Sequence, residues 1–398
     1  MELPLENVKV LDMSRMLPGP YCTWLLADMG AEVTRIEQPS EIAKGDKAHN
    51  ITSVDSRQRR KIRAYDLFTR NKKSILMDLK KENAREIIYK MAEKSDIFVE
   101  DYRPGAMERF GLDYEQIRKV NPQIIYCSIS LCGQDGPYRR KAGHDPVVLA
   151  LSGVLGQILD KDNVPVMPDP VPIADITAGL HAVIGILLAL RVKEQEGRGQ
   201  YIDIGMLDTT IPLLSGVYQR FFRDGVVPQR RGRQPYLGIW QTKDGKYICT
   251  TDLEPQYWNN FCRAMGKEEF IPYQHDGDKK EMIIEAVRQI ILTKTRDEWV
   301  ALLAEAGTQV APVYNIEEAL QDPQVIHRQM VLEVEDPVLG KVKQLGMPIK
   351  LSETPGKVRF MAPPPGNDTE ETMRRLGYSA GDIERFIEGG VIQHAYES

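Results

Sequence analysis

Short apolar runs alternate with segments of helical periodicity over the first part of the chain. The apolar runs, which are typical of buried strands, cover residues 8–13, 32–37, 74–79, 97–102 and 124–129. The helical segments between them include residues 20–29 and 80–94. Strands that alternate with helices indicate a mostly parallel sheet with helices on both faces. The pattern therefore predicts an α/β fold of the Rossmann-like type.

The middle of the chain is helical and unusually apolar. Two segments between residues 145 and 191 are hydrophobic on nearly all sides, and a further strand is expected at 200–206. Such helices must be buried, either inside one subunit or in an interface between subunits. The longest apolar run, at 176–190, is shorter than the roughly 20 residues that span a bilayer, and His181 interrupts it. Since the N-terminus also lacks the pattern of a signal peptide, we expect a cytoplasmic protein.

The pattern changes after residue 223. A basic linker at 228–233 precedes a hairpin at 239–252, in which an Asp-Gly pair forms the turn. Helical segments follow, and the chain becomes extended again near residue 331. A final amphipathic helix ends the sequence. With 398 residues the chain is long enough for two domains, and we predict a small second domain at residues 225–330.

Charge and cysteine content exclude several classes of protein. The 52 Lys and Arg residues are outnumbered by 57 Asp and Glu residues, for a net charge of −5. Nucleic acids and anionic membrane surfaces attract positive proteins, so we expect neither as a partner. The five cysteines include no CxxC pair, which argues against a disulfide framework or a structural zinc site. We predict no metal site.

Three acid–base residues stand at positions where chemistry is expected. His144 lies in a Gly-His-Asp sequence, Asp175 begins the most apolar helix, and Glu254 follows the hairpin. Each has a structural alternative, because a histidine can be structural, an aspartate can cap a helix, and a glutamate can be solvated. The glycine-rich fingerprint of a dinucleotide site does not follow the first strand, so we do not predict a nicotinamide dehydrogenase.

Basic residues occur in several short clusters. Each cluster alone is typical of a solvated surface, but several clusters at strand ends of an α/β sheet could gather a polyphosphate. The clusters are Arg59, Arg60, Lys61 and Arg63; Arg70, Lys72 and Lys73; Arg139, Arg140 and Lys141; and Arg230, Arg231 and Arg233.

The sequence resembles the family III CoA-transferases, which include the α-methylacyl-CoA racemases. The opening VKVLDMSRMLPGPYCTWLLADMGAEVTRIEQP is similar to the start of that family. The similarity continues through FVEDYRPGAMERFGLDY, AGHD and ADITAGLHA to LGYSAGDIERFIEGGVI near the C-terminus. It implies a large Rossmann-like domain built from residues 1–224 and 331–398, with the smaller α+β domain at 225–330 between them. It also implies an interlocked homodimer.

The resemblance implies one of two activities on an acyl-CoA. In the racemases, a His and an Asp that match His144 and Asp175 carry the α-proton between the two faces of an enolate, and a Glu that matches Glu254 bonds the His. The presence of all three residues predicts a racemase acting on a 2-methylacyl-CoA. The alternative is a CoA-transferase, in which Asp175 acts as a nucleophile through an aspartyl-CoA thioester.

The resemblance also implies a path for coenzyme A, which enters as part of the substrate; no prosthetic group is implied. Gln38 stands where the family often has a basic residue, so Arg59, Arg60 or Arg63 could supply the phosphate contact instead. The residues that match CoA-binding positions are Arg15, Met16, Leu17, Lys73, Leu76, Tyr102, Arg103, Arg109, Tyr138 and Lys141.

Overall fold

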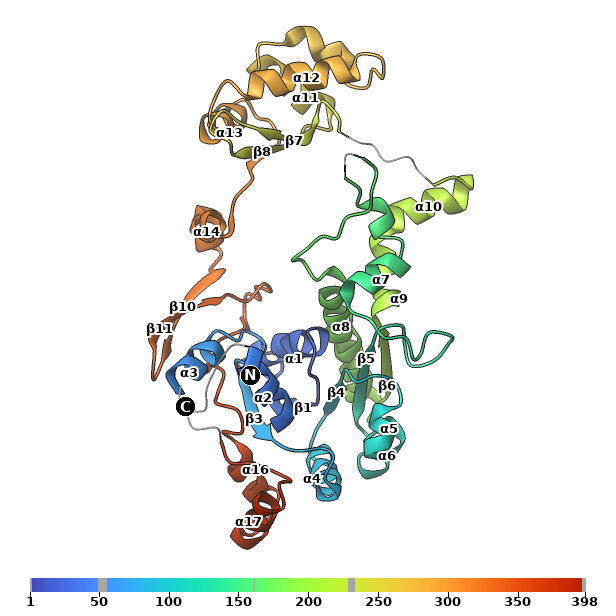
Figure 1. The fold of residues 1–398 in the computed structure, drawn as a ribbon, viewed down its shortest axis with the longest axis vertical. Coiled ribbons are helices and arrows are strands. Elements are labelled where there is room, and N and C mark those ends of the chain that lie inside the picture. The colour runs from blue at the N-terminus through green and yellow to red at the C-terminus, as the bar shows by residue number, and fades with distance from the viewer. Residues whose placement is uncertain (1, 49–55, 161, 228–232, 396–398) are drawn as a thin grey trace. The chain divides into compact units, whose positions relative to one another are not determined.

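The chain forms two compact units in the computed structural model, which describes residues 2–48, 56–160, 162–227 and 233–395 (Figure 1). The first unit contains Met1–Gly225 together with Gln329–Ser398, and the second is Val226–Arg328. The first unit is therefore built from both ends of the chain. Of the predicted basic residues, Arg230 and Arg231 lie outside the described residues.

Six parallel strands form the sheet of the first unit, in the order β3-β2-β1-β4-β5-β6 (Figure 1). The order reverses between β1 and β4, and ligands of such sheets bind outside the carboxyl ends of the strands at this switch point. The prediction of an α/β fold with a parallel sheet is confirmed. The strands are β1 (Lys9–Asp12), β2 (Glu32–Glu37), β3 (Lys72–Leu76), β4 (Ile97–Glu100), β5 (Ile125–Ser130) and β6 (Tyr201–Gly205).

Helices cover both faces of this sheet, because successive strand residues point to opposite faces and both sets are apolar. One hydrophobic core joins the sheet to α1 (Pro18–Asp28), α7 (Asp145–Leu151), α8 (Ile173–Glu196) and α9 (Met206–Thr210). The other joins it to α4 (Glu82–Ala92), α5 (Ala106–Phe110), α6 (Tyr114–Val120), α16 (Thr369–Arg375) and α17 (Ala380–Glu388). The single C-terminal helix expected from the sequence is thus a pair of helices. The remaining helices of the unit are α2 (Pro39–Ala48), α3 (Ser56–Ala64) and α10 (Ser215–Asp224).

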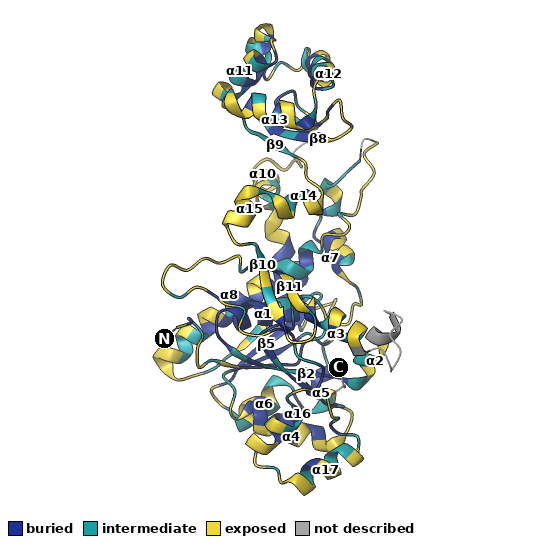
Figure 2. Cartoon of the chain, turned by 90° about the vertical axis from the view of Figure 1, so that its left-hand side faces the viewer, coloured by how far each residue is buried: buried dark blue, intermediate teal, exposed yellow. Residues whose placement is uncertain are grey.

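Helix α8 is buried on only one side within the chain (Figure 2). Small residues such as Ala178 and Ala182 allow it to pack closely on α1, β5 and β6. Its other side exposes Ile184, Leu187 and Leu188, so the expectation of complete burial is not met inside one subunit. Among the described residues, α8 is the one helix whose length and composition would allow it to cross a membrane, a property shared by core helices. The apolar run at 176–190 is shorter than this helix because α8 extends beyond the run at both ends.

Two residues of the basic clusters are fully buried ion-pair partners. Arg70 bonds Asp28 at 2.6 Å, and Lys72 bonds Asp12 at 3.0 Å. All four side chains are at most 1% exposed. A charge removed from water in this way is retained only when it is paired, so neither cation is available to a phosphate.

The cluster around α3 is also engaged within the fold. Arg60 pairs with Asp336 at the end of β10 (Val331–Asp336), which forms a hairpin with β11 (Gly340–Leu345). Arg63 bonds both carboxylate oxygens of Glu37, at 2.9 and 2.5 Å. These contacts fasten α3 to the sheet and the hairpin, which contradicts the suggestion that Arg60 or Arg63 compensates for Gln38 in holding a phosphate.

The second unit is a small antiparallel sheet covered by helices. The predicted hairpin is present, and its core contains Trp240, Trp258 and Trp299. Its strands are β7 (Leu237–Gln241), β8 (Tyr247–Thr251) and β9 (Val310–Pro312). Its helices are α11 (Pro255–Ala264), α12 (Lys280–Ile291), α13 (Arg296–Glu305), α14 (Ile316–Gln321) and α15 (Pro323–His327).

Candidate active site

A cavity of about 250 Å³ lies at the carboxyl ends of β1, β4 and β5, beside the switch point of the sheet. Loops after these strands line it together with the segment before α7 and the first turn of α8. The cavity brings together eight of the catalytic and CoA-binding residues that the sequence nominates. They are Arg15, Met16, Leu17, Tyr102, Arg103, Lys141, His144 and Asp175.

Asp145 holds the two predicted acid–base residues of this cavity together. It is the first residue of α7, directly after His144, and its side chain is buried. Its Oδ2 accepts hydrogen bonds from the backbone N–H groups of Ala174 at 2.6 Å and Asp175 at 3.2 Å. A carboxylate satisfies free N–H groups in the first turn of a helix and is stabilised there by the helix dipole. Asp145 therefore ties the start of α7 to the start of α8, so that His144 and Asp175 line one cavity.

The Asp175 carboxyl group has an unusual protonation equilibrium. Its pKa is raised from 3.8 to about 6, chiefly by burial and in smaller part by the neighbouring Asp145 carboxylate, while His144 acts in the opposite direction. At pH 7 a group of this pKa is roughly nine-tenths ionised. Asp175 is thus mostly a carboxylate at neutral pH, and its charge is poorly solvated.

The remaining acid–base candidates are less enclosed. His144 is exposed, directly precedes α7 and is one of the residues that line the cavity. Glu254 belongs to the second unit, where it immediately precedes α11 and accepts a hydrogen bond of 3.3 Å from Gln309.

Asp101 shapes the loop that follows β1. One of its carboxylate oxygens accepts the backbone N–H of Arg15 and the other accepts that of Met16, each at 2.8 Å. Burial raises the pKa of Asp101 to about 7. The Arg15 guanidinium lies 3.7 Å from the centre of the Tyr102 ring and bonds Glu41 at 3.0 Å. Asp101 therefore sets the backbone that presents Arg15 to the cavity.

Sequence reasoning missed the roles of both Asp101 and Asp145. The available signal was their position: Asp101 follows a buried strand directly, and Asp145 adjoins His144 at a helix start. Acids at such places meet free backbone N–H groups. Their hydrogen-bond partners are distant in sequence and could not be identified without the fold.

Positive charge predominates at the cavity. Arg15, Arg103, Arg139 and Lys141 all line it. Arg139 bonds Glu108 at 3.0 Å, and the Lys141 ammonium lies 5.2 Å from the centre of the half-exposed Tyr138 ring. Guanidinium and ammonium donors of this kind match phosphate and carboxylate oxygens.

Four of the predicted CoA-binding residues are not among those that line this cavity: Lys73, Leu76, Arg109 and Tyr138. Lys73 lies near the start of β3, where it pairs with Glu32 and lines a separate cavity with Lys9. This is the amino edge of a parallel sheet, opposite the edge that holds Asp175. Lys73 is expected on the CoA path from the family resemblance alone, and the strand, predicted at 74–79, begins at Lys72, which places Lys73 near its amino end. The Leu76 side chain is fully buried, and Arg109 is an exposed residue of α5.

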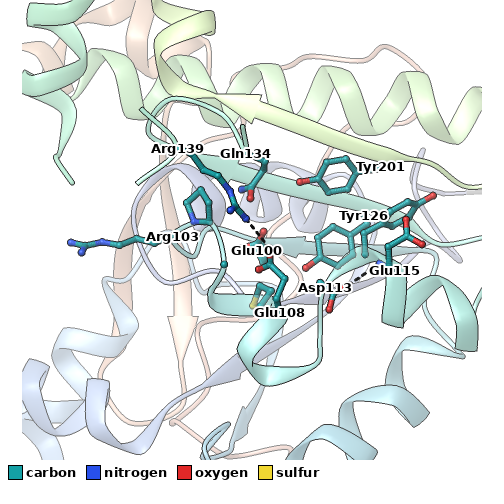
Figure 3. Close-up of a pocket in the computed structure, with 13 residues that line it drawn as sticks. Glu100, Arg103, Glu108, Asp113, Glu115, Tyr126, Gln134, Arg139 and Tyr201 are labelled. Carbon is teal, nitrogen blue, oxygen red and sulfur yellow. Dashed lines mark hydrogen bonds and ion pairs between the residues drawn. The ribbon is translucent and has the colours of Figure 1, made fainter. Parts of the chain in front are cut away.

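A second cavity of about 390 Å³ adjoins the first and shares Arg103 and Arg139 with it (Figure 3). Glu100 lies in its wall, accepts the backbone N–H of Tyr102 at 2.7 Å, and is bonded by the Ser128 hydroxyl. Burial raises the pKa of Glu100 to about 8. Glu100 is therefore mostly uncharged at neutral pH.

The fold and the site define an α/β protein with a carboxylate at the switch point of its sheet and a cation-rich binding cavity. The sequence matches the model of CoA-transferase family III over residues 5–369, and the chain therefore belongs to that family. The resemblance seen in the sequence motifs is confirmed.

Several similar proteins are CoA-transferases by name. The chain is 33% identical to the succinyl-CoA–L-malate CoA-transferase alpha subunit of Chloroflexus aurantiacus, covering 96% of this chain and 91% of that protein. It is 31% identical to the succinyl-CoA:glutarate CoA-transferase of Homo sapiens, covering 98% of this chain and 90% of that protein. A solved CaiB/BaiF family protein from Brucella suis shares the fold with a TM-score of 0.81 and 25% identity, covering 94% of this chain and 100% of that one. These relatives favour the CoA-transferase alternative over the predicted racemase.

Proposed function

We propose that this protein is a CoA-transferase that moves coenzyme A from a dicarboxylic acyl-CoA to a second carboxylic acid through Asp175. The observation that carries the proposal is the Asp175 carboxylate, which is held at the start of α8 in a cation-lined cavity. The choice of dicarboxylic acids is supported by the substrates in the names of the relatives, which include succinyl-CoA, malate and glutarate.

The proposed reaction begins when an Asp175 carboxylate oxygen attacks the carbonyl carbon of the donor thioester. The C–S bond breaks, coenzyme A leaves as a thiolate, and a mixed anhydride links the acyl group to Asp175. The thiolate then attacks the Asp175 carbonyl of this anhydride, which releases the donor acid and leaves an aspartyl-CoA thioester. The acceptor carboxylate repeats these two steps in reverse, so that acceptor acyl-CoA leaves and the Asp175 carboxylate returns. No net proton is consumed.

The surrounding residues have roles suited to this chemistry. The cations of the cavity, Arg103 and Lys141 among them, would hold the phosphates of coenzyme A and the acid substrates. A carboxylate with a pKa of about 6 is ionised at neutral pH and is poorly solvated, which favours attack on a thioester. No step of this scheme transfers a proton through His144, which forms part of the cavity wall beside Asp175.

The test is to incubate the protein with succinyl-CoA and either malate or glutarate in D₂O, and to separate the CoA esters by chromatography with mass detection. We expect a new CoA ester only when an acceptor acid is present. Intact-protein mass spectrometry after succinyl-CoA alone should show a CoA adduct that Asp175→Asn lacks. Asp278→Asn, an exposed carboxylate of the second unit, is the matched control and should behave like the wild type.

A parallel incubation in D₂O with a chiral 2-methylacyl-CoA distinguishes a CoA-transferase from a racemase. Deuterium entering the α-position of a chiral 2-methylacyl-CoA without any acceptor acid, together with no transfer to any acid, would overturn the proposal. It would assign His144 and Asp175 to two-base proton transfer. His144→Ala should lower transfer yet leave it measurable, whereas it would abolish racemisation.

We further propose that the protein is a homodimer in which a second copy covers the exposed side of α8. Support comes from the side chains of Ile184, Leu187 and Leu188, which are 44–63% exposed in the single chain. Contiguous apolar surface of this kind marks interaction sites. Light scattering of the purified protein should give twice the chain mass of 45.2 kDa, and a monomer would contradict the proposal.

A further inference from the structure

Two residues at the Asp175 cavity carry buried polar atoms that have no hydrogen-bond partner within the described part of the chain. These atoms are the hydroxyl oxygen of Ser130 and the Nε of Arg15. Both residues line the cavity. Most buried donors in folded proteins are partnered, so an unpartnered donor at the wall of a binding cavity points to a polar atom supplied by a ligand.

Ser130 is positioned firmly for such a role. It is the last residue of β5, opposite Gly205 of β6, and only 7% of its surface is exposed. The contrast with Ser128 on the same strand is informative, because the Ser128 hydroxyl donates to Glu100 and accepts a hydrogen bond of 2.6 Å from Gln134. The Ser128 hydroxyl thus has its hydrogen-bond partners within the protein, whereas the Ser130 hydroxyl at the cavity has none among the described residues.

The chemistry of the two donors identifies the group that they fit. A hydroxyl and a guanidinium N–H both donate, and the guanidinium carries a positive charge, so an anionic oxygen acceptor forms the strongest hydrogen bonds with them. In the proposed substrates, the free carboxylate of the dicarboxylic acyl group is such an acceptor, whereas the thioester carbonyl is uncharged.

We propose that Ser130, with Arg15, binds the free carboxylate of the dicarboxylic acyl group and thereby selects dicarboxylic over monocarboxylic acyl-CoA substrates. This inference rests on the proposed acyl-CoA site. The hydroxyl supplies no proton to the reaction and its contribution is to substrate specificity.

The test compares succinyl-CoA with butyryl-CoA, which is similar in length but ends in a methyl group. Dissociation constants are measured by calorimetry in the Asp175→Asn background, where the proposed reaction is blocked. Ser130→Ala should weaken succinyl-CoA binding about tenfold and change butyryl-CoA binding less than about twofold, because only the former loses a charge-assisted hydrogen bond. Ser130→Thr keeps the hydroxyl and should retain most of the preference for succinyl-CoA.

The matched control is Ser152→Ala, which removes a buried hydroxyl that bonds the Leu149 carbonyl and does not line the cavity. It should leave the ratio of the two dissociation constants unchanged. If Ser130→Ala does not fold, as judged by circular dichroism, Ser130→Cys takes its place and should reduce the preference partly.

Equal weakening of both ligands by Ser130→Ala would assign the hydroxyl to the thioester carbonyl and overturn the inference. Unchanged binding of both ligands, or a starting protein that does not prefer succinyl-CoA, would also overturn it. Because binding is measured without turnover, absence of CoA transfer in the wild type would reject the proposed function separately.

Discussion

The substitution Asp145→Asn tests how the site controls the charge of Asp175. The Asp145 carboxylate accepts the N–H groups of Ala174 and Asp175, and it also raises the pKa of Asp175. Asparagine keeps a carbonyl oxygen for these hydrogen bonds but removes the negative charge. We therefore expect the pKa of Asp175 to fall while α7 stays attached to α8.

The size of the effect follows from the pKa of about 6 for Asp175. At pH 5 about a tenth of such a group is ionised, so kcat/KM for CoA transfer should be about a tenth of its plateau. If loss of the neighbouring charge lowers this pKa by about 1, roughly half is ionised at pH 5, a relative gain of about fivefold. A neutral acceptor in place of a charged one should cost about 1 kcal/mol of stability.

The assay measures kcat/KM for CoA transfer from pH 4.5 to 8.5. The values for each variant are divided by the maximal kcat/KM of that variant. The wild type should lose activity below an apparent pKa near 6, and Asp145→Asn below a lower value. Asp145→Ala serves as the structural comparison, because it leaves both N–H groups without their acceptor and should lower the free energy of unfolding by about 1–3 kcal/mol. An acid limb that stays in place or moves upward in Asp145→Asn would refute the electrostatic reasoning.

Three further outcomes are expected. Asp175→Asn should lower CoA transfer at least about 10³-fold with unchanged thermal unfolding, because an amide is a poor nucleophile; residual transfer near the wild-type rate would exclude Asp175 as the nucleophile. Glu100 has a folded-state pKa of about 8, above its ordinary 4.5, so the folded state binds this proton more tightly and stability falls as pH rises toward 8. Between pH 5 and 7 the wild type should lose on the order of 2 kcal/mol relative to Glu100→Gln in denaturant titrations, and parallel curves would contradict this. Lys141→Ala should weaken coenzyme A binding several-fold at low salt, whereas Lys73→Ala should leave it unchanged; calorimetry that shows the reverse would restore Lys73 to the CoA path.

The arrangement of charged residues explains why the basic clusters were hard to interpret from the sequence. Arg70, Lys72 and Lys73 lie within four positions of the sequence, yet Arg70 and Lys72 are buried in ion pairs, while Lys73 lies at the amino edge of the sheet. Whether each cation is buried in an ion pair depends on which acidic residues the neighbouring elements place near it. Asp28 lies on α1 and Asp12 on β1, both remote in sequence from the cations that they bind.

The sequence by itself determined the type and order of most elements and nominated Asp175 and His144. Apolar periodicity and Asp-Gly turn chemistry act over a few residues, so they can be read without the fold. Only the tertiary structure decided which side chains meet at the carboxyl edge of the sheet. Strand order and register bring Asp101 and Ser130 to the cavity of Asp175 and take Lys73 to the opposite edge, and such pairings depend on contacts between segments far apart in the chain.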